Sequence, residues 1–559
     1  MNGAPPQIPD SGPSLADERA VPGEKADLDA ERLSMLALLA LAALAVGLRL
    51  FTMHEPVERD LAIHALIANE WLHGRELYGD LWNHKPPASF FVHALFIRFF
   101  GMGEVQLLAL NICFGLWSLG ALYFVARQML HNRWAMLTAC LWGIVLGFCL
   151  PLQANQPNTE SLVRPMLLTA LGLWLGVERR RIPQPGMFIA ALLFFLTTLF
   201  KQHYAVIPAT LGAFLLLADW REQGRVTRRT LGQIAIIGLT GLLGWAAYAQ
   251  FLNSENLWAK FYEAAFTYNR IYAKGLGSTL IEALNLARPF LLDLLPLLLF
   301  SAAGLLWRMA RAPERRLFWL SGWMLGCFLA MAIPGQFFPH YYQLLIAPAI
   351  VSSLFLLENL YQTPLSRHRR IVTWAIAVLS LTMVLRLVWM LSMPSLMLPI
   401  LKYGHSEGMR FIAAQQFGKM LAARIPDGAP VFYVGSDPQV VFYAGGRIAP
   451  SKFYARWLDP AQSGKFAPVF LAETRQQFLA GNFDLVMTTG SPAFFSDPLV
   501  AQRLGRDFIQ LPRCIHTQRL WVRRTATEAA IQALIHRPWS GCDPSYESFR
   551  KWRAYPWRP

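Results

Sequence analysis

Long apolar runs recur along most of the chain, and they limit its fold more than any other feature. Eleven such runs are each close to the roughly 20 residues that a helix needs to cross a bilayer, although a few are shorter. Since 54% of the 559 residues are hydrophobic and only 15% are charged, a soluble fold could not bury this much apolar surface. The sequence therefore predicts a mostly α-helical, polytopic transmembrane bundle. The expected spans are residues 33–51, 105–126, 134–152, 161–177, 187–200, 204–218, 231–251, 289–307, 317–333, 342–360 and 371–391.

The distribution of arginine predicts how this bundle is oriented. With the N-terminus in the cytoplasm, the arginine-rich loops all lie on the cytoplasmic side, as the positive-inside rule requires. The apolar run 88–100 is short and contains His93 and Arg98, which favours an interfacial or re-entrant helix. Counting it as a span would place the later arginines outside. Because topology accounts for much of the formal net charge of +16, that charge does not indicate a nucleic-acid partner.

The composition divides the chain into three regions. Residues 1–32 are rich in Pro, Ala, Asp and Glu, and they predict a disordered cytoplasmic tail. Residues 33–393 form the expected transmembrane core, with long extracytoplasmic loops at 52–104 and 252–288. Residues 394–559 are predicted to be an extracytoplasmic C-terminal domain.

The pattern within 394–559 predicts a small α/β domain. Strands are expected at 429–435 and 483–490, with a further one at 514–523, and helical spacing occurs at 411–423 and 472–480. The six cysteines of the chain lack metal-ligand spacing, and an oxidising compartment would allow a Cys514–Cys542 disulfide.

Two charged residues in the first long loop are the strongest candidates for chemistry. Asp60 follows the first span by nine residues, with Glu55 and Glu58 nearby, and begins a helical stretch. A carboxylate partly removed from water can act as a general base, although Asp is also a favoured helix N-cap. Lys85 precedes Pro86 and Pro87, which hold it on a stiff corner suited to a phosphate. The alternative is a lysine that snorkels at the membrane edge.

Further polar groups fall on the same side of the membrane. Glu160 opens the fourth span, where it either has a functional role or complements the helix dipole, and Arg164 at i+4 could be its partner. Other residues could donate hydrogen bonds or positive charge to an anionic ligand, and together these groups predict a site at one membrane face. They are Lys201, Gln202, His203, Arg270, His340, Tyr341 and Tyr342.

The first-loop motif resembles a known family. The first span, the acid after it and the segment from Leu77 through Tyr78, Asp80, Trp82, His84 and Lys85 to Pro87 are similar to GT-C type membrane glycosyltransferases. The resemblance is to bacterial relatives of protein O-mannosyltransferases and of the lipid A aminoarabinose transferase, and it covers about residues 33–393. His340, Tyr341 and Tyr342 resemble a motif that appears late in these proteins.

This resemblance implies a reaction and a role for each site residue. It implies transfer of a sugar, with inversion, from a polyprenyl-monophosphate donor to an acceptor hydroxyl of a lipid or glycan, at the periplasmic face of the inner membrane. Asp60 would be the catalytic acid of the first loop, and Glu160 would hold the second acidic position. The donor phosphate would contact Lys85, Lys201, Arg270 and His340. Substrate contacts would come from Glu58, Tyr78, His84, Gln202, His203, Tyr341 and Tyr342.

The sequence leaves other functions open. Asn158-Thr159-Glu160 lacks the Asp-x-Asp pattern, so neither a divalent metal nor another cofactor is expected. A glycan ligase or polymerase with a lipid-diphosphate donor could share this architecture. A lipid or sugar transporter would need central polar residues and paired broken helices, which the sequence does not display. A non-catalytic membrane scaffold for the C-terminal domain is the remaining alternative.

Overall fold

The computed structural model describes most of the chain. It covers residues 22–525 except for 274–290, 362–365, 395–396, 424–429, 436, 449–451, 454–463, 490–491 and 511–517. The Cys514–Cys542 pair, part of the loop 252–288 and the segment 526–559 therefore lie wholly or partly outside the described residues.

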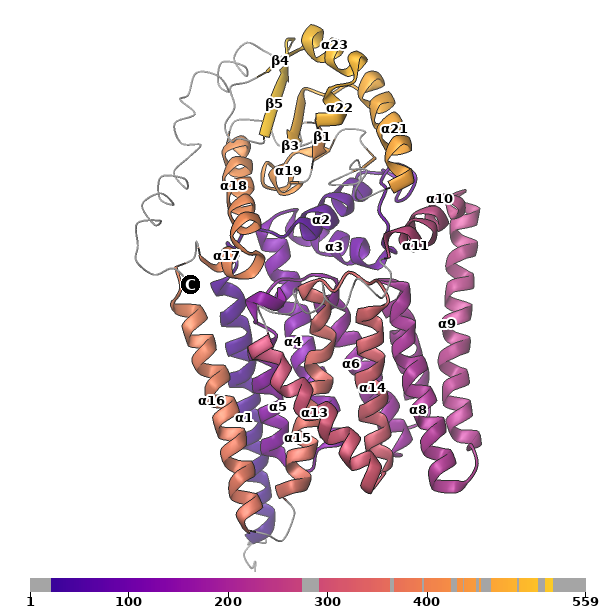
Figure 1. Ribbon diagram of the computed structural model, residues 1–559, viewed down its shortest axis with the longest axis vertical. Coiled ribbons are helices and arrows are strands. Elements are labelled where there is room, and N and C mark those ends of the chain that lie inside the picture. Colours follow the sequence, from indigo (N-terminus) through magenta and orange to yellow (C-terminus); the bar gives the residue numbers. More distant parts are fainter. Residues whose placement is uncertain are drawn as a thin grey trace, which may run out of the picture.

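A bundle of long helices forms the larger part of the protein (Figure 1). Each predicted span coincides with a helix, so the prediction of a mostly α-helical polytopic fold is confirmed. By length and composition, eight of the described helical segments could cross a membrane, and α5 and α7 are shorter apolar helices. The bundle helices are α1 (Pro22–Phe51), α4 (Glu104–Met129), α5 (Arg133–Leu146), α6 (Thr159–Glu178), α7 (Gly186–Thr198), α8 (Val206–Gln223), α9 (Arg228–Ser254), α13 (Leu291–Arg311), α14 (Arg315–Ala332), α15 (Ile346–Tyr361) and α16 (Ser366–Ser392).

The helices pack around a buried centre formed by α6 and α15, whereas α9 and α16 lie at the periphery. These helices can carry apolar residues on all sides, since each side faces either protein or lipid. The spans are helical because backbone groups in a bilayer must form their hydrogen bonds within the helix. Small residues allow close approach of neighbouring helices. At Gly326 of α14, an added Cβ would lie 3.0 Å from the Ile207 Cα of α8, so a larger residue would separate the two helices.

Two short helices lie across one end of the bundle (Figure 1). These are α2 (Arg59–Leu72) and α3 (Ala88–Phe100), and they pack against each other beneath the sheet domain. The segment predicted to be an interfacial or re-entrant helix is thus helical, and its position relative to a membrane stays a prediction. The second long loop adds α10 (Trp258–Tyr262), the π-helix η3 (Glu263–Tyr268) and α11 (Asn269–Tyr272) at the same end.

The C-terminal region carries a five-stranded mixed sheet in the order β2-β1-β3-β5-β4. Strand β1 (Pro430–Gly435) pairs in parallel with β2 (Arg447–Ile448) and β3 (Leu485–Thr489), whereas β5 (Gln518–Arg523) is antiparallel to β3 and β4 (Phe508–Gln510). The surrounding helices are α17 (Met397–Tyr403), α18 (His405–Ala422), α19 (Gln439–Tyr443), α21 (Ala467–Ala480), α22 (Pro492–Phe495) and α23 (Pro498–Asp507). The predicted α/β character is confirmed, and β2 and β4 are strands that the sequence did not indicate.

The N-terminal tail differs from its prediction. Helix α1 begins at Pro22 rather than Leu33, so residues 22–32 are helical instead of disordered. Proline is favoured at the first position of a helix, which fits a start at Pro22. The division of the chain at residues 32/33 and 393/394 otherwise stays a prediction.

The C-terminal region contacts the first long loop at several points, and these contacts position the site. The Lys402 Nζ lies 3.4 Å from Glu55 Oε1, and both side chains are buried. The backbone N–H of Val57 donates to the Tyr443 hydroxyl at 2.9 Å, and the Trp82 N–H donates to the Lys452 carbonyl at 3.0 Å. The two segments that carry Asp60 and Lys85 are therefore held partly by residues from the C-terminal region.

Candidate active site

The first pair of charges in the site is Asp60 and Lys85. The Lys85 Nζ donates to Asp60 Oδ2 at 2.7 Å and lies 3.2 Å from His64 Nε2. The Asp60 side chain is 41% exposed and that of Lys85 only 11%. The carboxylate is thus open to an incoming group, while the ammonium is directed by two partners at the base of the site.

Local structure fixes both members of this pair. Glu58 caps α2 by accepting a hydrogen bond from the Asp60 N–H at 3.0 Å, so Asp60 lies in the first helical turn. On the other side, the Tyr78 hydroxyl donates to the Lys85 carbonyl at 3.0 Å, and the Lys85 N–H donates to Asn83 Oδ1 at 3.1 Å. Pro86 and Pro87 then lead into α3, which begins at Ala88.

A second, buried pair consists of Glu160 and Lys201. The Lys201 Nζ donates to Glu160 Oε1 at 2.5 Å, and the Tyr204 hydroxyl donates to the same oxygen at 2.9 Å. The His340 Nε2 lies 4.0 Å from Glu160 Oε2, and Lys201 Nζ lies 3.9 Å from the centre of the Tyr341 ring. Residues from α6, the α7–α8 turn and the segment before α15 thus meet at one point.

The electrostatics separate the two carboxylates at the start of α2. Burial raises the pKa of Asp60, but the Lys85 ammonium and then His64 outweigh it and lower that pKa well below its ordinary value. Burial and the Asp60 carboxylate raise the pKa of Glu58 to about 7, against the opposing effects of Lys85 and Arg59. Asp60 is therefore ionised at neutral pH while Glu58 is poised to change its charge there. Since His340 also lowers the pKa of Asp60, the two charge pairs share one electrostatic environment.

The remaining predicted residues lie at different distances from these pairs. The His84 ring lies 5.5 Å from that of Tyr272, and burial followed by the charge of Lys85 lowers the pKa of His84 to about 3. Tyr78 is buried beneath Lys85, and Gln202 donates to the Ala265 carbonyl at 2.8 Å, which joins the α7–α8 turn to the second long loop. His203 packs against the Tyr204 ring with 5.0 Å between ring centres, and Tyr342 is buried beside Tyr341.

Within the described residues, neither Arg270 nor Arg164 is joined to the two charge pairs by a side-chain contact. Arg270 is exposed on α11, and no contact within the described residues brings it to the cluster, so its role at the donor phosphate stays a prediction. Arg164 was expected to be the partner of Glu160, and that expectation is wrong. Its Nε donates to Ser118 Oγ at 3.4 Å instead, because this side of α6 faces α4 rather than the active site.

The sequence reasoning missed His64 and Tyr204. His64 lies four residues after Asp60 on the same helix face, and that spacing could have identified it. Tyr204 lies three residues after Lys201, at the start of a predicted span, so the sequence pattern did not indicate a role for its hydroxyl. Within the described ranges, no group of three His, Cys, Asp or Glu residues could hold a metal ion. Metal independence itself stays a prediction.

Removal of one member of the buried pair should destabilise the protein. We expect Glu160→Gln to lower the free energy of unfolding by about 3–5 kcal/mol, because the Lys201 ammonium would remain buried without its counter-charge. Adding Lys201→Met should recover part of that loss, as measured by unfolding of the purified protein in mixed detergent micelles. The half-exposed pair Arg308–Glu314, at 3.5 Å, is the matched control and should contribute about 0–1 kcal/mol. Equal losses at the two pairs would contradict the structure.

Glu58 should give the protein a pH-dependent stability. Its pKa is about 7 in the folded state and 4.5 ordinarily, so its stabilising contribution is complete below pH 4.5 and is lost as the pH rises through 7. We expect the melting temperature of the wild type to fall between about pH 5 and pH 8, and to fall less in Glu58→Gln, which keeps the cap acceptor. Glu76→Gln, at an exposed position of the same loop, should follow the wild type. Parallel melting curves for wild type and Glu58→Gln would refute the assignment.

The comparisons with known proteins point to one fold. Residues 84–247 match the family described as dolichyl-phosphate-mannose-protein mannosyltransferase. The crystal structure of ArnT from Cupriavidus metallidurans bound to undecaprenyl phosphate is 15% identical, with a TM-score of 0.55 over 88% of this chain and 98% of that one. The crystal structure of the same ArnT in the apo state has the same identity and coverage, with a TM-score of 0.52. None of the curated proteins matches the sequence. The fold is therefore of the GT-C type.

Proposed function

We propose that the chain, which has a GT-C fold and whose residues 84–247 match the mannosyltransferase family, is a membrane glycosyltransferase with a polyprenyl-monophosphate sugar as its donor. The observation that carries the proposal is the Asp60–Lys85 pair, in which an open carboxylate lies beside a fixed ammonium. The undecaprenyl phosphate bound to the structurally similar ArnT supports a donor of this class. The arginine-rich loops at the opposite end of the bundle support an extracytoplasmic site on the inner membrane.

The proposed reaction is a direct displacement. The oxygen of an acceptor hydroxyl, on a lipid or glycan, attacks the anomeric carbon while the bond from that carbon to the phosphate oxygen breaks. The hydroxyl proton passes to Asp60, and the polyprenyl phosphate leaves with both bonding electrons. A single displacement inverts the anomeric configuration. No general acid is needed, since a phosphate is already a weak base, and no metal is required when cations of the protein stabilise the leaving group.

The pairing of Asp60 with Lys85 makes the base responsive to the donor. Without donor, the ammonium lowers the pKa of Asp60, and the carboxylate is a weak base. A donor phosphate that contacts Lys85 draws the ammonium away from Asp60 and raises that pKa. Asp60 then becomes a stronger base only when the sugar is in place. Lys201 and His340 supply further hydrogen-bond donors beside the site, with Glu160 as their common partner.

The test is a donor assay on the purified protein. Undecaprenyl-phosphate sugars are added with cell-envelope acceptors, and release of free undecaprenyl phosphate is measured with and without EDTA. Release that persists in EDTA and requires Asp60 is expected. Release only from a lipid-diphosphate donor would favour the glycan ligase, and release from neither donor would overturn the proposal.

A further inference from the structure

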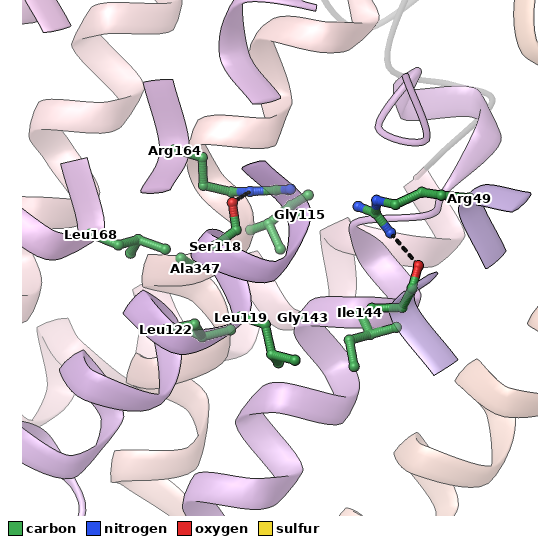
Figure 2. A pocket seen from close by; sticks show the side chains of 12 residues that line it. Arg49, Gly115, Ser118, Leu119, Leu122, Gly143, Ile144, Arg164, Leu168 and Ala347 are labelled. Atoms are coloured by element: carbon green, nitrogen blue, oxygen red, sulfur yellow. Dashed lines mark hydrogen bonds between the residues drawn. The ribbon is translucent and has the colours of Figure 1, made fainter. Parts of the chain in front are cut away.

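Two arginines inside the bundle have no role in the proposed reaction. Arg49 lies near the end of α1 and Arg164 lies on α6, and the two residues are only 4% and 8% exposed. They face each other across a narrow pocket of about 30 Å³ (Figure 2). The other residues that line this pocket are small or apolar and come from α1, α4, α5, α6 and α15, among them Gly115, Ser118 and Ile144.

The charges of both arginines are uncompensated. Arg49 Nη1 donates to the Ala45 carbonyl at 3.2 Å, but its Nε is buried with no partner. Arg164 donates from Nε to Ser118 Oγ at 3.4 Å. None of the residues lining the pocket is acidic, and no carboxylate in the described part of the chain pairs with either guanidinium. Two unpaired cations close together between membrane helices are costly, so an anionic ligand would stabilise this pocket.

The chemistry of the pocket fits a phosphate group. A guanidinium offers several N–H donors in a fixed fork that matches phosphate oxygens, and two forks from opposite sides would neutralise one anion. Gly115 allows the Arg49 side chain to approach α4 closely, because a Cβ at position 115 would lie 2.6 Å from the Arg49 Nε. The Arg49 guanidinium therefore occupies a space that a side chain at position 115 would fill.

The depth of the pocket indicates a lipid rather than a soluble anion. Arg164 lies one turn, roughly 6 Å, further into the bundle than Glu160, and Arg49 lies two residues before the end of α1. Both side chains therefore lie within about one turn of the end of the bundle that carries the candidate active site, where the headgroup of a surrounding lipid could reach them. On α4, beside Gly115 and Ser118, Leu116 and Trp117 are each 38% exposed on the bundle surface. The helix that lines the pocket therefore also carries exposed apolar side chains, against which acyl chains could pack.

We propose that Arg49 and Arg164 bind the phosphate of a membrane phospholipid, at a site separate from the donor phosphate site at Lys85. The acyl chains of that lipid would lie along the apolar surface of α1 and α4, and its phosphate would supply the missing counter-charge. The site does not depend on the proposed reaction, since it needs neither Asp60 nor a sugar donor.

The experiment measures lipid retention by the delipidated full-length protein with native mass spectrometry. Dioleoyl-phosphatidylglycerol is compared with dioleoylglycerol, which has the same chains but no phosphate, and with inorganic phosphate alone. We expect one tightly held phosphatidylglycerol and no comparable dioleoylglycerol. Losing charge-assisted hydrogen bonds should weaken its binding at least about tenfold in Arg49→Gln/Arg164→Gln. Arg98→Gln, which removes an exposed arginine of α3, is the matched control.

Other results of this experiment would contradict the phospholipid site. Equal retention of the two lipids by the wild type would overturn the proposal without reference to any variant. Inorganic phosphate that binds as tightly as phosphatidylglycerol would assign an ion site rather than a lipid site. If Arg49→Gln/Arg164→Gln does not yield folded protein, Arg49→Lys/Arg164→Lys keeps both charges and should retain the lipid with reduced affinity. Unchanged affinity in either double variant would also contradict the assignment.

Discussion

Replacing Asp60 by Asn is expected to lower kcat by about 10²–10⁴-fold, the range that loss of a general base produces. The amide has nearly the same shape and can still accept a hydrogen bond from Lys85, but it cannot take the proton of the acceptor hydroxyl. The KM for the donor should change little, because Lys85 remains available for the phosphate. The measurement is the initial rate of polyprenyl-phosphate release at several donor concentrations.

The loop itself provides the control for this variant. Asp80 is exposed in the same loop, and its Oδ2 accepts a hydrogen bond from the Glu76 N–H at 3.0 Å. Asp80→Asn should keep kcat near that of the wild type. Glu58→Gln tests which of the two carboxylates at the start of α2 acts as the base. If kcat collapses in Glu58→Gln and survives in Asp60→Asn, Glu58 is the base and the assignment of Asp60 is wrong.

Replacing Lys85 by Met should reduce kcat/KM for the donor by about 10²–10³-fold, the usual cost of losing a fixed group that stabilises developing charge. Methionine has a similar length without the charge. The kcat should fall and the KM for the donor should rise, since the ammonium contacts the phosphate in the bound donor and in the leaving group. Lys85→Arg should restore only part of the activity, because a planar fork does not replace a compact ammonium between Asp60 and His64.

The pH profile gives Lys85→Met an independent signature. Loss of the ammonium removes the main cause that lowers the pKa of Asp60, so that pKa rises. Since the base must be ionised, activity is lost as the pH falls through this pKa. The acidic limb of the rate profile should therefore move to higher pH in the variant. Lys260→Met, at an exposed position of α10, should leave both the rate and the profile unchanged. A wild-type profile in Lys85→Met would contradict the contact.

Local sequence indicated two residues of the candidate site that the structure brings into contact. The stiff Pro86–Pro87 corner and the acid after the first span pointed to Lys85 and Asp60, because both signals lie within a few residues of the group concerned. Local reasoning failed for Arg164, although i+4 spacing placed it near Glu160. Lys201, which lies in the α7–α8 turn, pairs with Glu160 instead, and Arg164 faces α4.

The sequence by itself determined the membrane bundle, its expected orientation and the α/β character of the C-terminal region, since length, apolar periodicity and arginine placement are local properties of the chain. Only the tertiary structure decided which charges meet. Glu160, Lys201 and His340 are far apart in sequence, and helix packing brings them together. The same packing leaves Arg49 and Arg164 facing each other without an acid. Helical periodicity fixes the face on which a side chain lies, whereas its partner depends on which helix packs against that face.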